Sequence, residues 1–285
     1  MYYYQRLHKK DISARTFILS AFSVAYAKPR SIGHLIQAGE LLDISASTIR
    51  VAVVRLQKEG LLESVGRGIY GPGPNARNLL NRLQSWQDVL HRRRDWDGDW
   101  WMALTGILGR TDRKQLRERE RALRLSGYRD TGAGFWVRPA NLAESLKLHR
   151  DGLIDIGLDS DIVLSRVSEI TMATTVDWSS LWSINDLHTS YTASIEALRE
   201  SMDQLQDKDL HDAAVETFLI GQSIIKVIHF DPLLPAEMYN SDLFEELLST
   251  AIAYDKLGKQ TWERLQFSLE RNDADADTII EAADQ

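Results

Sequence analysis

Apolar and polar positions follow a helical pattern in three successive segments near the start of the chain. The first covers residues 13–25, and Pro29 separates it from the second, because proline disfavours helical geometry in the residue before it. The second begins after Ser31, a residue that can cap a helix. The third begins at a group of small polar residues and ends at Gly60, with its apolar positions on one side at Ile49, Ala52, Val53 and Leu56. The pattern predicts three amphipathic helices.

Two short strands follow the third helix. Residues 61–64 and 67–70 read as strands on either side of a Gly66-Arg67-Gly68 turn. The glycine- and proline-rich residues 71–74 form a stiff connector. Three helices followed by a strand, a glycine turn and a second strand are typical of a winged helix-turn-helix domain, which we expect over residues 1–74.

The third helix carries the candidate DNA-reading residues. In a winged helix this element lies in the DNA major groove. Arginine can bond guanine O6 and N7 and valine can contact a thymine methyl group, so we predict base contacts at Ser47, Thr48, Arg50, Val51 and Val54. Phosphate contacts position a protein without reading sequence, and we predict them at Arg30, Ser31, Arg55, Lys58 and Arg67. A winged helix that docks another protein is the alternative.

The remainder of the chain predicts three further parts. Residues 75–94 read as a linker helix. Residues 95–176 read as alternating strands and helices, with strands at 100–108, 128–138, 154–158 and 162–167 and helices at 112–125 and 141–148; this order suggests a ferredoxin-like α/β domain. Residues 177–285 are helical, with long helices expected at 190–206, 210–229 and 243–267. The fold class is therefore α+β and multi-domain.

Charge is distributed unevenly over these parts. The net charge is −7, yet residues 1–94 carry 15 Lys and Arg against 6 Asp and Glu, whereas residues 140–285 carry 10 against 28. A basic head on an acidic body suits a protein that holds a polyanion at one end. The absence of cysteine fits a reducing cytoplasm, and no apolar run approaches the roughly 18–20 residues of a membrane span. We therefore expect a cytoplasmic protein with no membrane partner.

The chain resembles the PaaX-like family, the phenylacetate-degradation repressors. The match is carried by Ala14-Arg15-Thr16-Phe17-Ile18-Leu19, residues 47–62, Trp96-Asp97-Gly98-Asp99-Trp100, residues 123–139 and Asp231-Pro232-Leu233-Leu234-Pro235, in the family's order. The resemblance implies a homodimer that binds double-stranded operator DNA through the winged helix. It also implies a central domain similar to the small nuclease subunit of the CRISPR adaptation complex, and a helical C-terminal domain. It further implies repression of a catabolic operon, relieved by an aryl-CoA thioester such as phenylacetyl-CoA.

Trp136, Trp178 and Trp182 are the candidate lining of an effector pocket, although tryptophans at such spacing also serve as core residues. The basic run at residues 91–94 either contacts phosphates or complements the dipole at a helix end.

Catalytic chemistry has little support in the sequence. The seven histidines show no metal-binding spacing, and phosphate-loop, nucleophile-elbow and dinucleotide-binding motifs are absent. We expect no enzyme activity, cofactor or metal. A metal-dependent nuclease built on the central domain is the alternative function, but the end of the first central strand, Thr105-Gly106-Ile107, offers no carboxylate for a metal.

Overall fold

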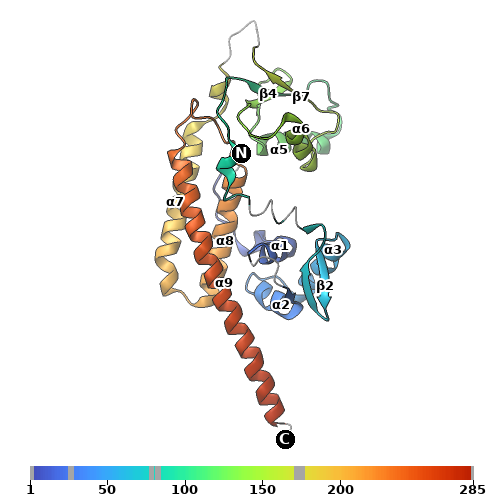
Figure 1. The fold of residues 1–285 in the computed structure, drawn as a ribbon, viewed down its shortest axis with the longest axis vertical. Coiled ribbons are helices and arrows are strands. Elements are labelled where there is room, and N and C mark those ends of the chain that lie inside the picture. The colour runs from blue at the N-terminus through green and yellow to red at the C-terminus, as the bar shows by residue number, and fades with distance from the viewer. Residues whose placement is uncertain (1–2, 25–28, 77–79, 81–84, 170–176, 284–285) are drawn as a thin grey trace. The chain divides into compact units, whose positions relative to one another are not determined.

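The computed structural model (Figure 1) contains helices and two antiparallel sheets, which confirms the predicted mixture of α and β structure. It describes residues 3–24, 29–76, 80, 85–169 and 177–283. The chain forms two compact units. The N-terminal unit comprises residues 5–86, 195–224 and 249–285, and the central unit comprises residues 1–4, 87–194 and 225–248.

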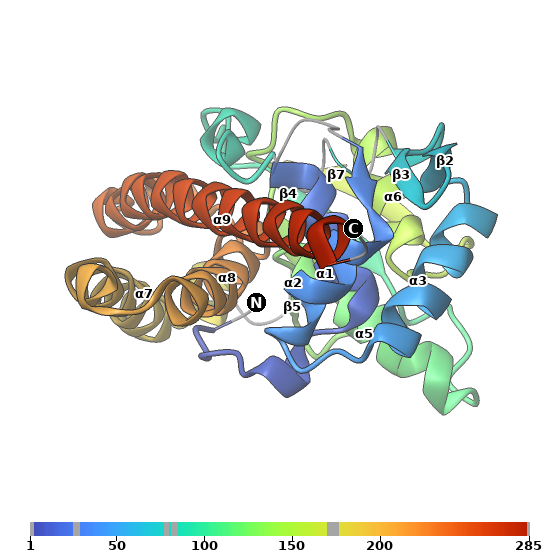
Figure 2. The same ribbon diagram turned by 90° about the horizontal axis from the view of Figure 1, so that it is seen from below.

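Three helices and a small sheet form the first part of the N-terminal unit. The helices are α1 (Ala14–Val24), α2 (Ile32–Glu40) and α3 (Ala46–Lys58). The strands are β1 (Arg30–Ser31), β2 (Leu62–Gly66) and β3 (Ile69–Pro72), in the spatial order β1-β3-β2. Figure 2 shows α3 beside β2 and β3. The three predicted helices and the strand–turn–strand are therefore present.

Local chemistry explains where these elements begin and end. The Ser31 hydroxyl accepts a hydrogen bond from the His34 backbone N–H, and the Ser45 hydroxyl accepts one from Thr48, so each serine caps a helix. Gly60 has a φ of +69°, in the left-handed region that glycine adopts readily, and it ends α3. Phe17, Ile49 and other buried side chains of the three helices share one core.

Segments from the end of the chain complete this core. Phe218 packs edge-on against Phe17 with ring centroids 6.1 Å apart, and Trp262 packs against Phe218 at 6.1 Å. The Leu7 backbone N–H donates to the Ser223 hydroxyl at 3.0 Å. The predicted domain boundaries at residues 74, 94 and 176 place these residues in separate domains. In the structure they belong to one compact unit.

The central unit is built on a four-stranded sheet. Its elements in chain order are β4 (Trp100–Leu104), α5 (Arg113–Leu125), β5 (Arg129–Asp130), β6 (Phe135–Pro139), α6 (Leu146–Asp155) and β7 (Val163–Val167). All paired strands are antiparallel, in the order β5-β6-β4-β7. Helices α5 and α6 lie on one side of this sheet (Figure 1). Trp101 contacts His149 of α6, and Trp136 contacts Arg124 of α5, so both tryptophans project from the face that these helices cover.

Three predictions for this region are wrong, two in the bounds of an element and one in its presence. The strand predicted at 100–108 ends at Leu104, because the chain turns at Gly106, whose N–H bonds the Gly134 carbonyl at 2.6 Å. The helix predicted at 141–148 begins at Leu146, because Ser145 caps it, and continues to Asp155. The strand predicted at 154–158 is absent, because this helix and the turn at Gly157, with a φ of +109°, occupy those residues.

The predicted linker helix at 75–94 is described only in part. Residues 77–79 and 81–84 lie outside the described residues. Residues 85–88 form a turn, and Val89–Arg92 form a short 3-10 helix, η2, so the helix does not continue to residue 94 as predicted.

Long helices make up most of the remaining chain. These are α7 (Ile184–Gln204), α8 (Leu210–His229) and α9 (Asp242–Ala283), with short 3-10 helices at Lys9–Asp11, Trp178–Leu181 and Leu205–Asp207. The prediction for α8 is confirmed. Helix α7 begins before the predicted residue 190, because the Ser183 hydroxyl accepts the Asp186 N–H at 3.3 Å, and α9 runs past the predicted end at residue 267. None of the described helices is long and apolar enough to cross a membrane.

Candidate nucleic-acid interface

Helix α3 has one buried face and one exposed face. Ile49, Val53 and Leu56 are at most 1% exposed. With 3.6 residues per turn, Ser47, Val51, Val54 and Lys58 lie on the opposite side of the helix, and all four are exposed. Val51 and Val54 are 50% and 51% exposed. Arg50 and Arg55 lie on the two flanks of this face, so two cations border an apolar pair.

The cations of this face are not compensated. Within the described part of the chain, the side chains of Arg50, Arg55 and Lys58, and that of Arg67 in the β2–β3 turn, make no hydrogen bond or ion pair, and all four residues are exposed. Other arginines of the N-terminal unit do have partners: Arg6 pairs with Glu216 at 3.5 Å. Positive charge without an internal partner is available to an external anion.

The hydroxyls at the start of α3 form a small cluster. The Ser45 Oγ lies 3.0 Å from the Ser47 Oγ and 2.8 Å from the Thr48 Oγ1. Ser47 and Thr48 remain exposed while they make these bonds. A hydroxyl both donates and accepts, so each can bond an outside group as well.

The turn between β2 and β3 presents Arg67. Gly68 adopts a φ of +69°, and its carbonyl accepts the Ile32 backbone N–H at 2.8 Å, which ties the turn to the start of α2. Val65 and Ile69 on either side of the turn are 51% and 41% exposed. The turn therefore presents an exposed arginine between two exposed apolar side chains.

Arg30 and Ser31 are placed differently from the sequence prediction. Both are half-buried. The Arg30 guanidinium donates to the Ala21 carbonyl at 3.2 Å and to the Gln266 side chain at 2.8 Å, and the Ser31 hydroxyl caps α2. Their polar atoms are used inside the unit, so we leave both residues out of the candidate interface.

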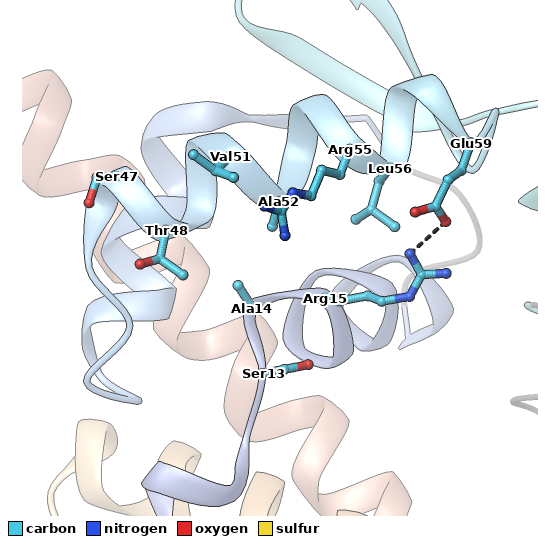
Figure 3. Close-up of a pocket in the computed structure, with 10 residues that line it drawn as sticks. All are labelled: Ser13, Ala14, Arg15, Ser47, Thr48, Val51, Ala52, Arg55, Leu56 and Glu59. Atoms are coloured by element: carbon cyan, nitrogen blue, oxygen red, sulfur yellow. Dashed lines mark hydrogen bonds and ion pairs between the residues drawn. The ribbon is translucent and has the colours of Figure 1, made fainter. Parts of the chain in front are cut away.

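A groove of about 580 Å³ lies between the start of α1 and helix α3, and we call it the α1–α3 groove. Figure 3 shows Arg55 and Glu59 reaching from α3 toward α1, where Arg15 meets Glu59. The Arg15 Nη1 lies 2.6 Å from the Glu59 Oε2. Sequence reasoning missed Arg15 and Glu59, because residues 44 positions apart carry no periodic signal of contact.

The three tryptophans predicted to line an effector pocket do not meet. Trp178 and Trp182 pack around Trp100, with ring centroids 5.2 and 6.1 Å from it. Trp136 points to the other face of the sheet. It pairs with Ala103, which lies three residues after Trp100 in β4, and successive side chains of a strand point to alternate faces. The Arg124 guanidinium lies over its ring at 5.1 Å. All three tryptophans are at most 6% exposed, as core residues are.

The basic run at residues 91–94 is held within the central unit. Arg92 lies 3.8 Å from Glu144, Arg93 lies 3.2 Å from Glu245, and Arg94 donates to the Ala140 carbonyl at 2.7 Å. These contacts support neither of the two interpretations of the run. They fasten the segment before the sheet to the loop between β6 and α6 and to the start of α9.

Two buried arginines of the central unit were not predicted. Arg119 of α5 donates to both carboxylate oxygens of Asp159, at 2.6 and 2.9 Å. Arg138 of β6 donates to the backbone carbonyls of Ser126 and Pro232 at 2.6 and 3.2 Å, and burial lowers its pKa to about 10. Both guanidinium groups therefore make their hydrogen bonds inside the central unit and stabilise its fold.

The described residues contain no group of three or more His, Cys, Asp or Glu side chains that could hold a metal ion. The nuclease alternative therefore gains no support from the central unit.

The chain is similar to a protein family over part of its length and to a solved structure. No curated protein matches it. An uncharacterized protein, Rv0674 from Mycobacterium tuberculosis, has a similar solved structure, with 20% sequence identity, a TM-score of 0.57, and coverage of 88% of this chain and 99% of that one. At this identity the likeness shows the fold alone. Residues 13–70, which run from α1 into β3, match the family model described as PaaX-like protein, so the resemblance seen in the sequence is confirmed over this part of the chain.

Proposed function

We propose that the chain is a transcription regulator that binds double-stranded DNA in a sequence-specific manner. The family match suggests a regulator. The observation that carries the DNA-binding part is the face of α3, where Arg50, Arg55 and Lys58 have no partner among the described residues and border the exposed Val51 and Val54.

The proposed domain organisation is a winged helix at residues 1–74, a linker at 75–94, a ferredoxin-like domain at 95–176 and a helical domain at 177–285. The helix–strand–turn–strand order of α3, β2 and β3 supports the first, with β2 and β3 as the wing. The β-α-β-β-α-β order of the central sheet supports the ferredoxin-like domain.

Within this interface the residues divide by role. Arg50, Val51 and Val54, with the hydroxyls of Ser47 and Thr48, are the proposed base-reading residues, because they occupy the exposed side of the helix that enters the groove. Arg55, Lys58 and Arg67 are the proposed phosphate contacts, which position the protein.

The resemblance leads us to propose a cytoplasmic homodimer that represses a catabolic operon and releases DNA when an aryl-CoA thioester binds. We assign no residues to the effector, since the predicted tryptophans lie on two faces of one sheet and are buried.

The roles of α3 and the wing are tested by two arginine variants. On a duplex selected by the protein from a randomised pool, Arg50→Ala should weaken binding by about 1–3 kcal/mol and relax base preference at one position. Arg67→Ala should weaken all sequences alike and flatten the salt dependence by about one phosphate contact. Unchanged specificity and salt dependence in both variants would reject the assigned roles.

A further inference from the structure

The α1–α3 groove shares a wall with the proposed DNA-reading face. Thr48, Val51 and Arg55 of α3 belong both to that face or its flank and to the groove. The opposite wall comes from the start of α1, with Ala14 and Arg15 (Figure 3). A nucleic-acid strand that follows the α3 face on the Arg55 side therefore passes the mouth of this groove.

The groove holds two arginines from two different helices and one carboxylate. Arg55 has no partner among the described residues, whereas Arg15 is held by Glu59 at 2.6 Å. The side chains of Arg15 and Glu59 are 48% and 47% exposed. Exposed ion pairs are weak and are screened by salt, so an incoming anion can displace Glu59 from Arg15.

The groove is also lined by small and apolar side chains. Ala14 and Ala52 contribute only methyl groups, and Leu56 is buried. The guanidinium fork matches the geometry of a phosphate, as it matches that of a carboxylate. The Glu59 carboxylate thus occupies, on Arg15, the position that a phosphate oxygen would take.

We propose that the α1–α3 groove binds one phosphodiester of the DNA backbone between Arg15 and Arg55, and that Glu59 holds Arg15 in the free protein and gives it up to the phosphate. This inference rests on the proposed function. It adds α1 to the interface, extends the contacts to a phosphate beside the α3 face, and makes Glu59 a competitor of DNA.

A backbone phosphate is favoured over a small free anion by the surroundings of the groove. The groove is open and continuous with a face whose other cations, Arg50 and Lys58, are also unpartnered among the described residues. Residues 1–94 carry 15 Lys and Arg against 6 Asp and Glu. A row of uncompensated cations on a basic segment suits a polyanion.

The test compares four forms of the full chain: wild type, Arg15→Ala, Glu59→Gln and the double variant that carries both changes. Binding to a labelled duplex of mixed sequence is measured between about 50 and 200 mM salt, the range over which phosphate contacts dominate the change in affinity. Arg6→Ala is the matched control, because it also removes one exposed arginine that is paired with a carboxylate, that of Glu216, outside the groove.

Arg15→Ala should weaken binding and flatten the slope of log K against log salt by about 0.9, the contribution of one phosphate. Glu59→Gln should tighten binding, and the double variant should bind more weakly than Glu59→Gln alone. Arg6→Ala should match wild type.

Two results would overturn the inference. If the double variant binds as tightly as Glu59→Gln, Arg15 only neutralises Glu59 and touches no phosphate, and the inference alone fails. If wild type binds no duplex at low salt, the proposed function and this inference fall together.

Discussion

The hydroxyl of Tyr191 on α7 donates a hydrogen bond to the carboxylate of Asp231, which lies just after α8. The other oxygen of Asp231 accepts the Leu233 backbone N–H at 2.7 Å. Asp231 is 8% exposed. The segment Asp231-Pro232-Leu233-Leu234-Pro235 is thus fixed at its first residue by one buried carboxyl group.

Burial makes this carboxyl group sensitive to pH. It raises the pKa of Asp231 from 3.8 to about 6, so the folded protein binds this proton more tightly than the unfolded chain does. The stability that the protonated Asp231 contributes is fully present below about pH 4 and is lost as the pH rises through 6. Between pH 4 and 7, wild type should lose about 2 kcal/mol of unfolding free energy relative to Asp231→Asn, which carries no charge at any pH.

Urea unfolding of both proteins across this pH range measures the difference, and the remaining carboxylates cancel in the comparison. Parallel stability curves for wild type and Asp231→Asn would contradict the raised pKa.

Glycines of the N-terminal unit provide a second prediction. A Cβ added at Gly73 would lie 2.4 Å from the Gly60 carbonyl oxygen, and backbone cannot move aside cheaply. Gly73→Ala should therefore destabilise the protein by about 1–3 kcal/mol. Gly221, inside α8, has no atom within 4 Å of such a Cβ, and Gly221→Ala should stabilise by about 0.5–1 kcal/mol. Melting temperatures that fail to move in opposite directions would contradict these placements.

Elements specified by neighbouring residues were predictable from the sequence. Helix α3 is delimited by its cap at Ser45 and its glycine at Gly60, and the turn at Gly68 is set by a backbone conformation that glycine favours. The starts of α6 and α7 were missed, because Ser145 and Ser183 resemble many other serines until the following residues are seen to be helical.

Interactions between distant residues were not predictable. In the sequence, Arg119 and Arg138 resemble arginines that lie on a protein surface. Their burial depends on contacts with residues distant in the chain, Asp159 for Arg119 and Pro232 for Arg138. Trp136 and Trp178 were grouped by residue type, whereas the alternation of side chains across the sheet separates them.

The candidate interface likewise has one part that the sequence predicts and one part that it does not. The exposed side of α3 followed from helical periodicity. The α1–α3 groove did not, because it depends on how α1 packs against α3.

The exposed valines of α3 predict readout of thymine methyl groups. Replacing thymine by deoxyuridine at a contacted position should cost wild type about 0.8 kcal/mol for each lost methyl, about a fourfold loss in affinity. The double variant Val51→Ala with Val54→Ala should bind both duplexes equally. Competition titration on the selected site measures this, and equal sensitivity of the two proteins would remove the valines from base reading.

Effector binding is tested by melting temperature. A ligand that binds only the folded protein must stabilise it, by about 2.7 kcal/mol at a hundredfold excess over its Kd. We expect one member of a panel of aryl- and acyl-CoA thioesters to raise the melting temperature, with free CoA as the control. A panel without any shift would reject an aryl-CoA effector and leave the DNA-binding proposal standing.

The most direct test of sequence-specific binding is selection by the full wild-type chain from a pool of randomised duplexes at low salt. The unpartnered cations and exposed valines of α3 predict enrichment of one site, bound more tightly than the unselected pool and progressively released as salt rises. Failure to retain any duplex, or retention without enrichment, would contradict a sequence-specific regulator.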